Sequence, residues 1–154
     1  MKIHNFSKIQ IINTTIDKAW DFFSNPANLS KITPPSMNFE ITSQLPDKIY
    51  PGLIITYKVS PLPFFRVNWV TEIRQAVEKK YFIDEQRFGP YKFWYHIHLF
   101  RPSANGLEME DIVYYGLPFG YIGNLLGSAI VRRQLNYIFD YREKQIEKLF
   151  NQKI

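Results

Sequence analysis

The chain has 154 residues, a length typical of one domain and sufficient to bury a core without disulfides or structural metals. It is 45% hydrophobic and 21% charged, which excludes a disordered chain, a collagen-like repeat and a low-complexity linker. Its 19 basic and 14 acidic residues give a net charge of +5, and they are scattered along the chain. This pattern favours a solvated surface over a polyanion-binding site.

The chain contains no cysteine, which excludes disulfides, a thiolate nucleophile and cysteine-ligated metals. Its first residues lack the apolar run of a secretory signal, and no stretch approaches eighteen uninterrupted apolar residues. We therefore expect a soluble, cytoplasmic protein. No repeat, composition break or flexible linker interrupts the sequence, so residues 1–154 are predicted to form a single domain.

The beginning of the chain predicts a strand followed by two short helices. Residues 2–13 are rich in Ile and Phe and predict the strand. Residues 16–23 place apolar side chains at i, i+3, i+4 and i+7, which predicts a helix capped by one of two preceding threonines. Asn25-Pro26 is typical of a second helix start, and Pro34-Pro35 of its end.

From Met37 onward, apolar residues alternate with polar ones, which is typical of strands. Six strands are expected, one beginning near Met37 and the others over 53–60, 66–75, 80–87, 91–101 and 107–115. Short connections such as Gly89-Pro90 and Asn105-Gly106 separate them, so the strands should form an antiparallel meander.

The last part of the chain returns to helical spacing. An apolar stripe is expected at Val131, Leu135, Ile138, Ile146 and Leu149. Thirty helical residues span about 45 Å, enough to cross a whole sheet. The element order predicts an α+β fold in which a curved antiparallel sheet of about seven strands wraps around the long C-terminal helix and leaves an internal cavity.

A series of short motifs follows the same order along nearly the whole chain. They are Phe22-Phe23-x-x-Pro26-x-Asn28-Leu29, Thr33-Pro34-Pro35, Pro51-Gly52, Trp69-x-Thr71-x-Ile73, Phe82-x-Asp84-x-Gln86, Gly89-Pro90-Tyr91, Trp94-x-His96-x-His98-x-Phe100, Asp111-x-Val113-x-Tyr115, Leu117-Pro118-Phe119-Gly120 and Phe139-x-Tyr141-Arg142. The series resembles the SRPBCC superfamily, the helix-grip fold of START lipid-transfer domains, the birch-pollen allergen and polyketide cyclase-like proteins. More narrowly, it is similar to a bacterial subgroup labelled ligand-binding or cell-division-inhibitor-like. The resemblance implies a fold and a cavity; the reaction, if any, depends on the site.

Alternation on four strands assigns a set of aromatic and polar side chains to one face of the sheet. These candidate ligand-binding residues are Trp69, Thr71, Phe82, Asp84, Gln86, Trp94, His96, His98, Asp111 and Tyr115. If this face turns toward the last helix, it forms an apolar interior with a polar seam. The Asn105-Gly106 connection predicts a register that places His98 opposite Asp111 and His96 opposite Val113.

Several chemical uses of this polar seam remain open. As a structural network, a bond from Asp111 to His98 would hold the register and raise the pKa of the imidazole. As a ligand anchor, the same groups would bind the polar end of an apolar molecule. His96 and His98 could also supply two ligands of a metal site, with Asp84 or Asp111 as the third ligand. No other metal signature accompanies them, so we expect neither a metal nor a cofactor.

The function predicted from the sequence is noncovalent binding of a small hydrophobic or amphipathic ligand that is lipid-, quinone- or polyketide-like. One alternative is a cyclase- or dehydratase-type enzyme with His96 or His98 as an Asp-supported general base; no nucleophile elbow or phosphate loop supports it. A second alternative is an RNA- or protein-interaction module, although no RNA-binding strand motif or helix-turn-helix is present and no DNA partner is expected. The apolar segment Pro61–Phe65 is expected to cover the core, to form a lip of the cavity or to touch a membrane transiently. The sequence does not predict an oligomeric state.

Overall fold

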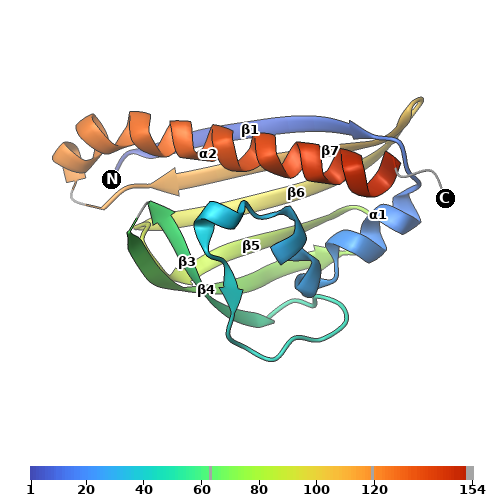
Figure 1. Cartoon of the computed structure of the whole chain (residues 1–154), viewed down its shortest axis with the longest axis horizontal. Helices are drawn as coiled ribbons and strands as arrows, with labels where there is room; N and C mark the ends of the chain where they lie inside the picture. Colours follow the sequence, from blue (N-terminus) through green and yellow to red (C-terminus); the bar gives the residue numbers. More distant parts are fainter. Residues whose placement is uncertain (63, 119, 152–154) are drawn as a thin grey trace.

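The computed structural model describes residues 1–62, 64–118 and 120–151, in which a seven-stranded antiparallel sheet is covered on one face by a long helix (Figure 1). The elements in chain order are β1 (Ile3–Ile12), α1 (Ile16–Phe23), η1 (Pro26–Ile32), η2 (Pro35–Met37), β2 (Glu40–Ile41), β3 (Ile54–Leu62), β4 (Phe65–Val77), β5 (Tyr81–Phe88), β6 (Phe93–Ser103), β7 (Gly106–Gly116) and α2 (Gly120–Asn151). The architecture is the expected α+β helix-grip fold.

The short helices begin at the predicted caps. The Thr15 hydroxyl accepts a hydrogen bond from the Lys18 amide, and the Asn25 side chain accepts one from the Ala27 amide at 3.0 Å. The second of these helices, η1, is a 3-10 helix. The predicted strand from Met37 is wrong over most of its length, because η2 runs to Met37 and the left-handed backbone of Asn38 (φ 44°) turns the chain before the two residues of β2.

The sheet has the strand order β1-β7-β6-β5-β4-β3-β2, and every neighbouring pair is antiparallel. The predicted β6–β7 register is confirmed: His98 pairs with Asp111 and His96 with Val113. Gly106 adopts a φ of +121° in this hairpin, and a Cβ there would lie 2.3 Å from the Ile12 carbonyl oxygen. This turn therefore requires glycine twice over, for its backbone angle and for the close approach of β1.

Helix α2 runs the length of the sheet, roughly along β1 and β7 (Figure 1). Its buried face includes Leu135, Phe139, Arg142 and Ile146, whereas Leu149, predicted to lie on this face, is 40% exposed. Within the described part of the chain, no helix is long and apolar enough to cross a membrane.

Aromatic clusters pack at two places beneath α2. At one end, Trp20 and Phe23 of α1 pack edge-on or tilted against Phe100 of β6, with ring centroids 5.7 and 5.4 Å apart. Beside the polar seam, Phe6 of β1 contacts Phe139 of α2 with ring centroids 4.9 Å apart, at the level where His96 pairs with Val113. These contacts fix the helix against the sheet next to a cavity that contains the predicted polar seam.

Candidate functional site

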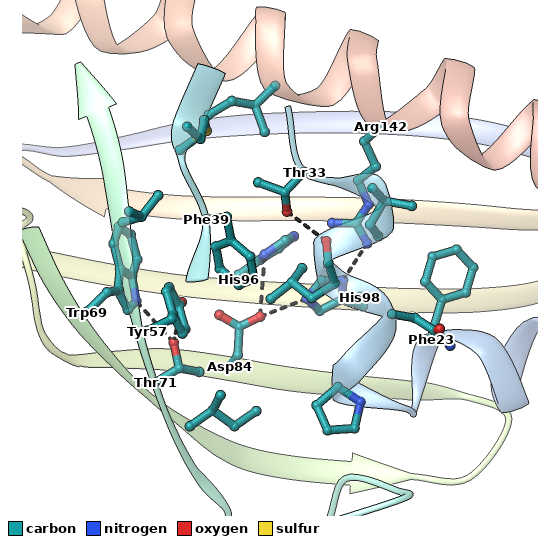
Figure 2. A pocket seen from close by; sticks show the side chains of 18 of the residues that line it. Phe23, Thr33, Phe39, Tyr57, Trp69, Thr71, Asp84, His96, His98 and Arg142 are labelled. Atoms are coloured by element: carbon teal, nitrogen blue, oxygen red, sulfur yellow. Dashed lines mark hydrogen bonds and ion pairs between the residues drawn. The ribbon is translucent and has the colours of Figure 1, made fainter. Parts of the chain in front are cut away.

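A cavity of about 200 Å³ lies between the sheet, α2 and the η1–β2 segment. Its wall is mostly apolar, with one polar end formed by side chains of β5, β6 and α2 (Figure 2). Of the ten candidate residues, these line it: Trp69, Thr71, Phe82, Asp84, Trp94, His96 and His98. The alternation of β4, β5 and β6 therefore carries both the aromatic wall and the polar end.

The other three candidates have different surroundings. Asp111 lies behind the imidazoles on β7. Gln86 clamps the turn after β5: its amide nitrogen donates to the Tyr91 carbonyl at 2.6 Å, and its amide oxygen accepts from the Tyr91 backbone nitrogen at 3.2 Å. Tyr115 is packed in the core, where its ring stacks on His4 at 5.2 Å between centroids.

Several lining residues were not among the candidates. They include Phe23, Thr33, Met37, Phe39, Tyr57, Leu135, Ile138 and Arg142. Arg142 carries a signal in the sequence, because it lies three residues after Phe139 and four before Ile146 and so interrupts an apolar helix face with a charge. Tyr57 also carries a signal, because it alternates with polar residues on β3 and pairs with Trp69. The others lie on helices or irregular segments, which strand alternation does not address.

The polar end is a closed network of two imidazoles between two carboxylates. Asp111 Oδ1 lies 2.9 Å from His96 Nε2 and 2.9 Å from His98 Nδ1. On the other side, Asp84 Oδ2 lies 2.8 Å from His98 Nε2 and 3.4 Å from His96 Nδ1. Figure 2 shows the Asp84 carboxylate in contact with both rings. Three adjacent strands, β5, β6 and β7, are thus joined through their side chains.

The four distances favour one distribution of the ring protons. Three contacts of 2.8 to 2.9 Å each suit a hydrogen bond, whereas the 3.4 Å contact between His96 Nδ1 and Asp84 is too long for a strong one. A hydrogen bond at each of the three short contacts requires protons on both nitrogens of His98 and on Nε2 alone of His96, so we assign His98 as charged and His96 as neutral. With the guanidinium of Arg142, the network then has two positive and two negative charges.

The pKa directions agree with this assignment. Burial disfavours the charged form of His98, but the hydrogen bonds and charges of Asp111 and Asp84 outweigh it and raise its pKa. Burial and the neighbouring charge of His98 lower the pKa of His96. Burial opposes ionisation of Asp111, yet the charge of Arg142 and the two imidazoles hold its pKa well below the ordinary range. The imidazoles likewise overcome burial and lower the pKa of Asp84.

Arg142 connects this network to α2. Its Nη2 lies 3.6 Å from Asp111 Oδ1 and 3.5 Å from His98 Nδ1. Its guanidinium also lies 5.7 Å from the ring centre of Phe139 and 5.8 Å from that of Phe23. Its buried Nε has no hydrogen-bond partner among the described residues. The guanidinium therefore neutralises the two carboxylates chiefly through its charge.

A second polar group in the wall is satisfied by its neighbours. The Trp69 indole N–H donates to Thr71 Oγ1 at 3.0 Å, and the Tyr57 hydroxyl lies 2.8 Å from the same oxygen. Burial, with the nearby charge of Asp84, raises the pKa of Tyr57, so this phenol stays neutral. The wall formed by β3 and β4 is therefore apolar in effect, and the polar end at Asp84 is distinct from it.

The network also contains a donor set suited to a metal. Ligand atoms of Asp84, His96 and His98 all lie within 4.8 Å of one another. Of the two carboxylates considered as a third ligand, Asp84 is therefore the one grouped with both imidazoles on the cavity side.

The apolar segment between β3 and β4 forms a tip at the edge of this site. Pro61 lines the cavity, while Phe64 and Phe65 are strongly exposed. Pro63, which belongs to the predicted lip, lies outside the described residues.

No protein-family model matches the chain, and a comparison with curated proteins found no similar sequence. Solved structures nevertheless share its fold over nearly the whole length. Protein CV1439 from Chromobacterium violaceum is 14% identical with a TM-score of 0.73, covering 97% of this chain and 99% of its own. TTHA0849 from Thermus thermophilus is 13% identical with a TM-score of 0.69, covering 96% and 95%. Ara h 8.0201 is 11% identical with a TM-score of 0.64, covering 94% and 98%.

At these identities the similarity establishes the fold. The chain is a helix-grip protein with a cavity between its sheet and its long helix, as the SRPBCC-like motifs imply. The narrower bacterial subgroup stays a prediction.

Proposed function

We propose that this chain binds a small amphipathic molecule, lipid-, quinone- or polyketide-like, noncovalently in the cavity beneath α2. The observation that carries the proposal is the division of the cavity wall: the surface is mostly apolar, and its ionisable side chains, Asp84, His96, His98 and Arg142, form one compact group. Pockets of this composition bind an apolar body through burial and fix its orientation through a few polar contacts.

Asp84 is the side chain best placed to contact the polar end of such a ligand. It lines the cavity, and its side chain is 17% exposed, whereas those of His96 and His98 are 7% and 5% exposed. A hydroxyl group of the ligand could donate a hydrogen bond to this carboxylate. The indoles of Trp69 and Trp94, which pack edge to face with centroids 5.3 Å apart, would contact the apolar body.

A matched pair of substitutions on α2 tests the proposal. Ile138 lines the cavity, whereas Ile130 on the same helix is 54% exposed. The probe is N-phenyl-1-naphthylamine, an uncharged dye that fluoresces in apolar surroundings. We expect one dye per chain and at least about a tenfold loss of affinity in Ile138→Trp, because the indole fills the space. Ile130→Trp should bind as the wild type does, and equal losses in both variants would contradict the proposal.

The natural ligand is best identified from the protein itself. Native mass spectrometry of the chain purified from its own host would report the mass of a co-purified molecule. A molecule that is lost from Ile138→Trp but retained by Ile130→Trp would be assigned to the cavity.

A catalytic use of the same end is the second candidate. The lowered pKa of His96 leaves a neutral imidazole in the cavity wall, and a neutral imidazole is the form that acts as a general base. Replacement of His96 by Asn separates the two functions: loss of turnover with dye binding retained favours an enzyme of the cyclase or dehydratase type, and retained turnover excludes His96 as the base.

A further inference from the structure

We propose that Asp84, His96 and His98 bind a divalent transition-metal ion at the polar end of the cavity. The inference goes beyond the proposed binding of an organic ligand and does not depend on it. It rests on the placement of the two imidazoles between two carboxylates, on the separations of the donor atoms and on their access from the cavity.

Both rings are oriented by one carboxylate. Asp111 Oδ1 lies 2.9 Å from Nε2 of His96 and 2.9 Å from Nδ1 of His98. Histidines that bind metals usually donate their remaining N–H to a carboxylate or carbonyl, which fixes the tautomer and the ring plane. Here a single buried carboxylate can accept from both histidines, and Arg142 lies 3.6 Å from the same oxygen.

Metal binding would release the second proton of His98, and donation to Asp111 then leaves the opposite nitrogens of both rings with lone pairs. Nδ1 of His96 and Nε2 of His98 face the same Asp84 oxygen, at 3.4 and 2.8 Å. Three electron-pair donors therefore converge on the cavity side of the network. A proton on His98 satisfies one of these contacts, whereas a cation between the three atoms satisfies all of them.

The separations suit a first-row ion. Zinc bonds of about 2.0 to 2.2 Å to nitrogen and oxygen place neighbouring ligand atoms of a tetrahedron about 3.3 Å apart. The 2.8 and 3.4 Å separations to Asp84 reach this value with movements of about half an ångström or less. The two imidazole nitrogens lie within 4.8 Å of each other and would also have to come to about 3.3 Å when the ion binds. Two imidazoles and one carboxylate suit Zn²⁺, Fe²⁺ or Co²⁺, whereas Mg²⁺ and Ca²⁺ prefer oxygen ligands.

The site is reached from the cavity. Asp84, His96 and His98 all line it, while Asp111 lies behind the rings. Three protein ligands leave a fourth position for water or a ligand, as in catalytic zinc sites. The two carboxylates and Arg142 together carry one net negative charge, so a bound dication leaves one positive charge. That charge favours an anionic oxygen at the fourth position, such as hydroxide, a carboxylate or an enolate.

The test uses the full chain, freed of metal by a chelator, dialysed, and titrated with zinc chloride or cobalt chloride alone. We expect one equivalent of Co²⁺ to produce visible d–d absorption and Zn²⁺ to displace it. In NMR spectra of the imidazole nitrogens, Zn²⁺ should shift Nδ1 of His96 and Nε2 of His98. His4, the third histidine, lies on β1 and should not respond. Unchanged His96 and His98 signals at tenfold excess zinc, or a response of His4 alone, would overturn the proposal.

Variants assign the roles of the two carboxylates. Asp111→Asn should weaken zinc binding about 10- to 100-fold, as expected for a residue that orients the ligands. Asp84→Asn should weaken it further because it removes a ligand, and His4→Asn should leave it unchanged. Equal affinity for Mg²⁺ and Zn²⁺ would indicate general attraction to carboxylates and refute the site. Should the Asp variants unfold, the wild-type NMR titration decides alone.

The two proposals fail separately. A chain that binds the naphthylamine dye but no zinc refutes the metal site and leaves the ligand-binding function standing. A chain that binds zinc but no dye does the reverse.

Discussion

Asp111→Asn is the substitution that most directly tests the buried network. In the chelated protein it removes one of two negative charges and leaves the charges of His98 and Arg142 opposed by Asp84 alone. Removing one partner from a buried ion pair costs about 3–5 kcal/mol of unfolding free energy, because the remaining charge stays buried. For a chain of this length, about 2–4 °C per kcal/mol gives a fall in Tm of roughly 6–20 °C. His98 should also lose its raised pKa.

The measurements are urea and thermal unfolding at pH 7 with chelator present, combined with NMR titration of His98. Asp140→Asn is the matched control: Asp140 pairs with Lys8 on the surface, and its side chain is 60% exposed. An exposed pair contributes at most about 1 kcal/mol, so the control should lose no more than that. A loss in Asp111→Asn no larger than in Asp140→Asn, with an unchanged His98 titration, would refute the charge assignment.

Three further predictions concern pH, the exposed tip and the tightest turn. The chelated protein should be most stable near pH 6.5, the ordinary pKa of histidine. Because folding lowers the pKa of His96, its neutral form stabilises the protein, and that stability is lost as pH falls below 6.5. Because folding raises the pKa of His98, its charged form stabilises the protein, and that stability is lost as pH rises from 6.5 through the raised pKa. Urea unfolding from pH 5 to 9 measures this, and His96→Asn should flatten the acid side. Phe64→Ser should weaken binding to anionic lipid vesicles by about tenfold or more, since Phe64 is fully exposed at the β3–β4 tip; equal sedimentation of both proteins with vesicles would exclude a membrane contact there. Gly106→Ala should destabilise the protein by about 1–3 kcal/mol in thermal unfolding, and by more than Gly52→Ala, whose added methyl group meets no atom within 4 Å.

The sheet side of the site could be predicted from the sequence because strands have a strict period of two. Alternation placed His96 and His98 on one face, and the short Asn105-Gly106 connection set the register that brings Asp111 opposite His98. The same reasoning placed Asp84 on the cavity side. Local pattern is sufficient here because each side chain's direction follows from its neighbours in the strand.

The other side of the site depends on tertiary packing. Arg142 enters the network only because α2 is rotated to bury Phe139 and Ile146, and no local pattern sets the height of a helix over a sheet. Gln86 has the alternation of a cavity residue, yet a bond to the nearby turn satisfies its amide. The predicted strand at Met37 is wrong over most of its length, since η2 and the left-handed Asn38 occupy its beginning and only Glu40 and Ile41 pair with β3.

Arg142 connects the two sides of the cavity, which we call its floor (strands β5, β6 and β7) and its roof (helix α2). The floor is three hydrogen-bonded strands tied together by Asp84, the imidazoles and Asp111, and the roof is a helix whose buried charge is drawn to that floor. An occupant that reorganises the Asp84 end therefore changes the attraction holding α2 in place. Binding in the cavity would then change the rate of amide hydrogen exchange along α2, which can be measured without any probe inside the cavity.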